Sequence, residues 1–317
     1  MDKTLVCSQI DQVIKELNNL KDAINGTNDI KVLSEEAPAP TTETTAVPPE
    51  PAPVTVPAQE YSDFDSLKTA LLSDKWPSAV NPNLICDPNS EVDKKERGIG
   101  VVELLVEDPL SSEDKFLDYG CGEGHCAAAA ASVLGCKLSV GYDPKPFNWP
   151  TVDNTTFTSS YDEVMSLGPY KAILIFDVLD HVENSGPSDL LIKAANLLTP
   201  DGKIYIRCHP WTSRHGTHHY HKLNKAFVHL VFNESELNQL TDYEPDPNLK
   251  ITFPMHSYKL NFDKAGLKIL SERKITEKVE SFFKIPKISE RIIKNTGHEQ
   301  FPEFQMGLQF VDYVLSK

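Results

Sequence analysis

The chain has 317 residues, of which 40% are hydrophobic and 24% charged, as in ordinary folded proteins. Its net charge of −15 argues against general nucleic-acid binding, which needs clustered lysine and arginine. The sequence has no run of 18 apolar residues and no apolar signal segment after Met1, so we expect neither a membrane span nor secretion. The six cysteines form no C-x-x-C pair, which is typical of reduced thiols in the cytoplasm.

The first segment, residues 1–33, has the apolar spacing of a coiled coil. Alternating steps of four and three connect Val6, Ile10, Val13, Leu17, Leu20 and Ile24. We expect residues 6–24 to bind other copies of the chain or a partner in a larger assembly. The alternative is a helix that packs on its own domain.

Residues 34–60 predict a tether. Seven prolines lie between positions 38 and 57, and the stretch from Ala37 to Glu60 contains no glycine. Such a segment buries too little apolar area to fold and samples extended polyproline II. Residues 61–114 then predict a helical N-terminal extension of the core, with helices near 64–72 and 91–107.

From residue 115 onward, strands and helices alternate, so 115–317 predict one α/β domain with a doubly wound, mainly parallel sheet. The expected strands are 115–119, 137–142, 156–158, 172–176, 203–208, 267–275 and 305–315. The expected helices are 124–134, 160–167, 187–198 and 258–266, and another begins near Asn233 with Ser235 as its possible cap.

A glycine-rich turn follows the first of these strands. Asp118 ends the strand, and Gly120-Cys121-Gly122-Glu123-Gly124 leads into a helix that starts near His125. Glycine permits positive φ and a close approach of backbone N–H groups to a ligand. Asp143 ends the second strand 19 residues after Gly124, where an acidic side chain accepts hydrogen bonds from ribose hydroxyls. Together these features predict a nucleotide-binding site.

These motifs resemble those of class I S-adenosylmethionine (SAM)-dependent methyltransferases. The matching segments are 116–124, Asp143, 175–182 and 197–203, and the third glycine comes one residue earlier than in dehydrogenases. The resemblance implies a seven-stranded Rossmann-like sheet with its last strand antiparallel. It also implies that SAM is the cofactor, held by Asp118, Gly120, Cys121, Gly122, Gly124, Asp143 and Asp177. A fainter similarity to bacteriophage methyltransferase-like proteins would place the chain in a host cytoplasm or a virion.

The methyl acceptor is less well defined. The segment from Asp177 to Asp180 lacks the Asn/Asp-Pro-Pro-aromatic loop of adenine and glutamine methyltransferases and the Pro-Cys of cytosine-C5 enzymes. Ribose 2′-O methyltransferases have a Lys-Asp-Lys-Glu tetrad. Asp177 matches the aspartate of this tetrad, but we find no residues that match its two lysines and its glutamate. We therefore expect an oxygen or nitrogen acceptor on a small molecule, with a protein side chain as a further option. An inactive assembly protein and a nucleic-acid methyltransferase stay open as alternatives.

Two histidines are candidate catalytic residues, because His181 and His209 follow the fourth and fifth strands, where open α/β sheets bind ligands. After His209 comes a histidine-rich segment in which Trp211, Arg214 and His215 are candidate acceptor-binding residues. It lies in a window, 202–233, that contains no carboxylate. We interpret the histidine-rich segment either as a polar lid over the acceptor pocket that binds an anionic group, or as a solvated loop. We predict no metal, because no familiar ligand spacing is complete.

Overall fold

The computed structural model describes residues 61–80, 90–182, 186–214, 216, 222–240 and 255–317. The chain divides into residues 1–55 and 56–317, and every described residue belongs to the second unit. The predicted coiled coil at 1–33 and the tether at 34–60 therefore lie outside the described residues. No described helix is both long and apolar enough to cross a bilayer.

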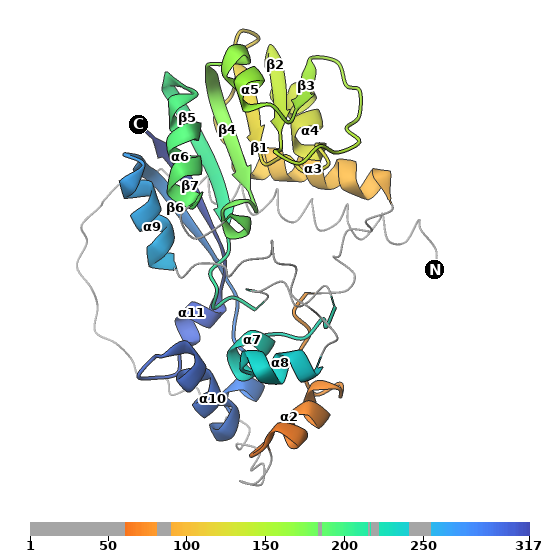
Figure 1. Ribbon diagram of the computed structural model, residues 1–317, viewed down its shortest axis with the longest axis vertical. Coiled ribbons are helices and arrows are strands. Elements are labelled where there is room, and N and C mark those ends of the chain that lie inside the picture. Colours follow the sequence, from red (N-terminus) through yellow and green to blue (C-terminus); the bar gives the residue numbers. More distant parts are fainter. Residues whose placement is uncertain (1–60, 81–89, 183–185, 215, 217–221, 241–254) are drawn as a thin grey trace, which may run out of the picture. The chain divides into compact units, whose positions relative to one another are not determined.

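A seven-stranded sheet in the order β3-β2-β1-β4-β5-β7-β6 forms the centre of the second unit (Figure 1). β7 runs antiparallel to both of its neighbours, and the pairs from β3 to β5 are parallel. This confirms the expected doubly wound Rossmann-like fold. The strands are β1 (Lys115–Tyr119), β2 (Leu138–Tyr142), β3 (Thr155–Thr158), β4 (Tyr170–Phe176), β5 (Leu198–Cys208), β6 (Lys268–Thr276) and β7 (Leu308–Ser316).

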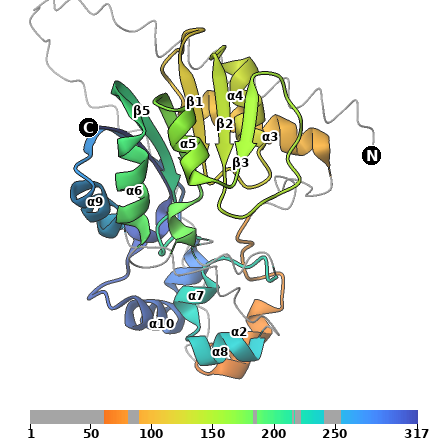
Figure 2. The same ribbon diagram turned by 45° about the horizontal axis from the view of Figure 1, so that its top comes forward.

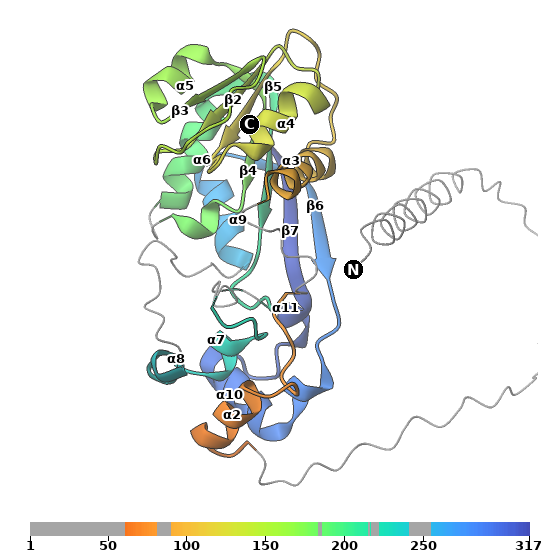
Figure 3. The ribbon, with the colours of Figure 1, turned by 90° about the vertical axis from the view of Figure 1, so that its right-hand side faces the viewer.

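Helices cover both faces of the sheet (Figure 3). One face carries α3 (Glu91–Leu105) and α4 (His125–Val133), and the other carries α5 (Tyr161–Leu167), α6 (Gly186–Asn196) and α9 (Met255–Lys264). Successive residues of a strand point to opposite faces, so Phe116 packs with α3 and α4, whereas Leu117 packs with α5 and α6. Alanines of α4 are buried in the core that this helix forms with α3 and the sheet. Their small side chains let α4 lie close to the sheet.

Five short helices and a 3-10 turn form a third core, which we call the helical cluster (Figure 2). They are α2 (Phe64–Leu71), α7 (Val228–Val231), α8 (Glu234–Leu240), η4 (Ser281–Lys284), α10 (Pro286–Thr296) and α11 (Glu303–Gly307). Trp76 lies inside this core, with its ring stacked on Phe232 at 5.6 Å. Its indole Nε1 donates to the carbonyl of Ala226 at 2.8 Å. The cluster thus joins three segments that are far apart in the sequence.

Several element boundaries differ from the sequence prediction, among them those of β5, β7 and α8. β5 begins at Leu198, because this residue pairs with Tyr170 before a register shift and the main ladder. The expected strand at 305–315 begins only at Leu308, and α11 precedes it. Ser235 does not cap α8: the Asn233 side chain accepts from Glu236 N at 3.0 Å, and the Glu236 carboxylate accepts from Asn233 N at 3.0 Å. This reciprocal pair is a capping box at Asn233.

Candidate functional site

The glycine turn is anchored to the end of β2. Gly120, Gly122 and Gly124 have φ values of 88°, 50° and 87°, all in the left-handed region that glycine tolerates. The backbone N–H groups of Gly120 and Cys121 both donate to the carbonyl of Tyr142, at 2.7 and 2.9 Å. The turn therefore lies directly over the carboxyl ends of β1 and β2.

The three glycines serve different steric purposes. A Cβ atom at Gly120 would lie 2.5 Å from Val178, and one at Gly124 would lie 2.4 Å from the ring of Phe157. A Cβ at Gly122 would meet no atom within 4 Å among the described residues. Gly120 and Gly124 are thus required by packing inside the protein, whereas Gly122 faces open space at the strand ends.

Two predicted cofactor-binding carboxylates hold this turn. Half-buried Asp143 accepts from the N–H of Gly122 at 3.0 Å and, through its other oxygen, from Lys145 N at 2.9 Å. Each carboxylate oxygen keeps a second lone pair for a ligand hydroxyl. Asp118 is buried beneath the turn and accepts from the N–H of Ala127 at 3.1 Å. Burial raises the pKa of the Asp118 carboxyl to about 7.

Cys121 is half-buried in the turn, with its Sγ 3.8 Å from the carbonyl oxygen of Gly122. Burial, together with the nearby carboxylates of Asp118 and Asp143, raises the pKa of this thiol above its usual range. The thiol is therefore protonated at neutral pH, and its place in the turn is that of a small, neutral side chain.

Asp177 follows β4 with a φ of 52°, an uncommon conformation for a residue other than glycine. Its carboxylate is 3.9 Å from the guanidinium of Arg97, and 29% of the side chain is exposed. Arg97 itself lies 5.5 Å from the centre of the Phe176 ring. Arg97 could not be predicted from the sequence, because nothing in α3 distinguishes it from an ordinary surface arginine.

The two candidate catalytic histidines meet at one buried carboxylate. The Asp180 side chain is fully buried, and its Oδ2 atom lies 3.5 Å from Nε2 of His181 and 3.6 Å from Nε2 of His209. His209 is 2% exposed, whereas His181 is 37% exposed. Both imidazoles lie at strand ends as expected, but only His181 is open to a molecule arriving from solvent.

The candidate acceptor-binding residues are placed differently. Arg214 contacts the carboxylates of Glu277 and Glu280 and donates to the carbonyl of Ser78 at 2.7 Å. The backbone carbonyl of Trp211 accepts a hydrogen bond from the His229 ring at 2.7 Å. The indole ring of Trp211 is half-buried and packs against the helical cluster. His215 lies outside the described residues, as do the other histidines at 218, 219 and 221.

The carboxylate-free window at 202–233 is neutralised in space by other parts of the chain. Lys203 pairs with Asp108 at 2.9 Å, and Arg207 pairs with Asp312 at 2.6 Å. Together with the pairing of Arg214, these contacts remove most of the local positive charge that the sequence indicates. The described residues contain no group of three histidine, cysteine or acidic side chains placed to hold a metal ion.

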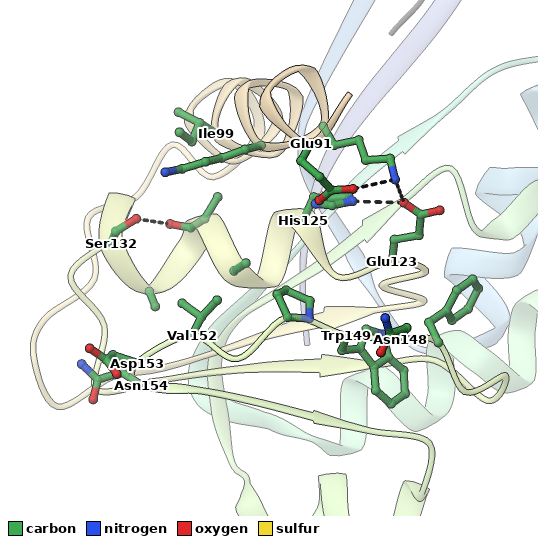
Figure 4. Close-up of a pocket in the computed structure, with 17 residues that line it drawn as sticks. Glu91, Ile99, Glu123, His125, Ser132, Asn148, Trp149, Val152, Asp153 and Asn154 are labelled. Carbon is green, nitrogen blue, oxygen red and sulfur yellow. Dashed lines mark hydrogen bonds and ion pairs between the residues drawn. The ribbon is translucent and has the colours of Figure 1, made fainter. Parts of the chain in front are cut away.

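A groove with a volume of about 940 Å³ lies beside the glycine turn (Figure 4). α3 and α4 form two of its walls, and residues 147–154 of the β2–β3 connection form the third. Glu123, His125 and Trp149 line it at the end closest to the turn, whereas Asp177 and His181 do not line it. The groove is therefore distinct from the strand ends where the histidines meet.

The strand order, the glycine turn and the acidic residue after β2 together define the class I SAM-dependent methyltransferase fold. A family model described as a methyltransferase domain matches residues 96–272, more than half of the chain. The chain belongs to this methyltransferase family and is a SAM-dependent enzyme.

The chain is also similar to several solved structures, at low sequence identity. A SAM-dependent methyltransferase from Archaeoglobus fulgidus is 15% identical with a TM-score of 0.44, and the match covers 70% of this chain and 94% of that chain. The cyclopropane synthase MmaA2 from Mycobacterium tuberculosis is 13% identical with a TM-score of 0.44, covering 84% and 100%. A putative SAM-dependent methyltransferase from Listeria monocytogenes is 17% identical with a TM-score of 0.43, covering 72% and 99%. No curated protein sequence matches the chain.

The residues at the turn fit SAM. Gly122 leaves open space over the strand ends, and Asp143 keeps free lone pairs beside it. When bound, SAM supplies a methyl group that is already activated by a sulfonium. The protein's part is then to orient the donor and acceptor, to exclude water and to receive the acceptor's proton.

Proposed function

We propose that this methyltransferase acts on an oxygen or nitrogen atom of a small molecule, with His181 as general base. The observation that carries this proposal is the position of the His181 imidazole. It is 37% exposed at the carboxyl end of β4, and its Nε2 atom lies 3.5 Å from the buried Asp180 carboxylate. The neighbouring Val178 packs against the glycine turn, so His181 belongs to the segment that borders the cofactor.

A hydroxyl or ammonium acceptor must lose a proton as it is methylated. An imidazole titrates near neutrality and can take this proton. The resulting imidazolium is stabilised by Asp180, whose carboxylate is shielded from water. His209, on the other side of the same carboxylate, is too buried to reach an acceptor, and its part is to hold Asp180 in place.

Charge distribution supports a small acceptor over a nucleic acid. The net charge is −15, and Lys203, Arg207 and Arg214 are each paired with carboxylates of the same chain. A nucleic-acid substrate needs lysines and arginines that exchange their counterions for phosphates. A small molecule makes no such demand.

The test starts with the wild-type enzyme. S-adenosylhomocysteine (SAH) release is measured with panels of small alcohols, phenols and amines, and in parallel with RNA and protein substrates. With an accepted small molecule, His181→Asn should lower kcat about 100- to 10,000-fold. Binding of SAM should stay unchanged, and the exposed His256→Asn serves as a matched control. Full activity of His181→Asn, or turnover with RNA or protein alone, would refute the proposal.

We also propose that residues 6–24 associate and so tether the enzyme to other copies or to a partner. The supporting observation is the apolar spacing in the sequence. Sedimentation velocity on the full chain should show a smaller species for Leu17→Asp than for wild type. Asn18→Asp adds the same charge outside the apolar spacing and should sediment like wild type. Equal sedimentation of all three proteins as monomers would refute self-association.

A further inference from the structure

The connection after β2 places an aromatic side chain against the glycine turn. The indole Nε1 of Trp149 donates to the carbonyl of Gly122 at 2.7 Å. The Trp149 ring is stacked on Phe157, with 5.8 Å between ring centres and 12° between planes. The indole is therefore held on one face by Phe157 and is fixed by its N–H to the turn.

Both polar backbone groups of Gly122 are thus bound by side chains that follow β2. Asp143 accepts from its N–H at 3.0 Å, and Trp149 donates to its carbonyl at 2.7 Å. Glycine has the widest range of backbone conformations of any residue, so an unrestrained Gly122 would sample many of them. The two hydrogen bonds select the one conformation, with φ of 50°, that is present in the turn.

We propose that Trp149 is a positioning residue for SAM binding, which acts through Gly122. Gly122 is the glycine of the turn that faces open space, so its peptide planes shape the surface offered to the cofactor. When only a fraction of the molecules have the turn conformation that binds the cofactor, the apparent affinity equals the intrinsic affinity multiplied by that fraction. Loss of the Trp149 N–H therefore weakens cofactor binding through the conformation of the turn. The inference depends on the cofactor alone and is independent of the acceptor.

The chain contains a matched control. Trp76 also donates its indole N–H to a backbone carbonyl, that of Ala226, at 2.8 Å, and it also stacks on a phenylalanine. Its location is the helical cluster, away from the glycine turn. Replacing either tryptophan by phenylalanine removes the same kind of hydrogen bond and keeps an aromatic ring. The two variants differ in whether the freed carbonyl belongs to the turn.

The experiment is calorimetric titration of the full chain with SAH. Trp149→Phe should bind SAH about 3- to 10-fold more weakly, the range expected for one neutral hydrogen bond. Trp76→Phe should bind SAH as wild type does, although its unfolding midpoint falls. SAH affinity within twofold of wild type in Trp149→Phe would overturn the proposal. An equal loss of affinity in Trp76→Phe would overturn it too, because the effect would then be general destabilisation.

A further measurement uses nuclear magnetic resonance on the wild-type protein, so it does not depend on the folding of a variant. In wild-type protein labelled on the tryptophan indoles, the Trp149 N–H signal should shift when SAH saturates the site, and the Trp76 signal should not. An unmoved Trp149 signal at saturation would also overturn the proposal.

Discussion

Alanine substitutions at the glycine turn should separate folding from cofactor binding. A left-handed conformation costs a non-glycine residue roughly 1–2 kcal/mol. For Gly122→Ala this is the whole expected loss of stability, because no described atom lies within 4 Å of the new Cβ. For Gly124→Ala the Cβ would lie 2.4 Å from the Phe157 ring and 3.1 Å from Trp149, so overpacking adds about 1–3 kcal/mol.

We therefore expect Gly124→Ala to lose about 2–5 kcal/mol of unfolding free energy and Gly122→Ala about 1–2 kcal/mol. Urea unfolding followed by circular dichroism measures both values. SAH binding should follow the opposite order for the folded proteins, with the greater loss in Gly122→Ala, because its methyl group enters the open space over the strand ends. Equal destabilisation by the two changes, or unaltered SAH affinity of Gly122→Ala, would refute this assignment of the glycines.

Three further outcomes follow from the charged groups. The folded-state pKa of Asp118 is about 7, against a usual 3.8, so the cofactor-free protein should lose stability as pH rises from about 4 to about 7. Asp118→Asn should remove this decline in urea unfolding, and an unchanged pH profile would contradict the burial argument. Arg214→Lys should lower the unfolding free energy by about 1–3 kcal/mol, because lysine keeps the charge but lacks the planar fork that reaches both carboxylates and the Ser78 carbonyl, and should leave SAH affinity unchanged. Fluorescence anisotropy should detect no salt-dependent binding of a 30-nucleotide RNA, and a steep salt dependence would show that the basic window is accessible after all.

The sequence predicted those parts of the fold whose signals are local. Buried strands such as β1 and β4 are short apolar runs, and the glycine turn has its own spacing between a strand and a helix. Asp143 was expected at the end of the second strand and lies there, with Gly122 as its partner. These features depend on neighbours within a few residues or on one crossover connection.

The helical cluster could not be predicted as a unit. Its core is assembled from Trp76, Phe232, Phe283 and their neighbours in three separate segments, and the pattern of one segment does not reveal which other segments it packs against. The same limitation hides the partners of Arg214, because Glu277 and Glu280 lie more than sixty residues further along the chain. A carboxylate-free window in a sequence therefore says little about the charge of the surface it forms.

The meeting of His181 and His209 at Asp180 is likewise a property of the sheet. β4 and β5 pair in parallel, so the residues after each strand arrive at the same edge. The sequence predicts both histidines at strand ends but assigns no role to Asp180. The missing information was burial, which makes Asp180 the shared partner of both rings.

The position of β7 has a consequence for synthesis on the ribosome. β7 lies between β5 and β6, so β6 emerges about 40 residues before the strand that connects it to the sheet. At 5–20 residues per second, β6 waits roughly 2–8 seconds with the backbone N–H and C=O groups of its ladder unpaired, because β7 is their partner. A stop codon before residue 308 would leave both β5 and β6 without their common neighbour. Nascent chains of this enzyme should therefore engage holding chaperones late, during synthesis of the final strand.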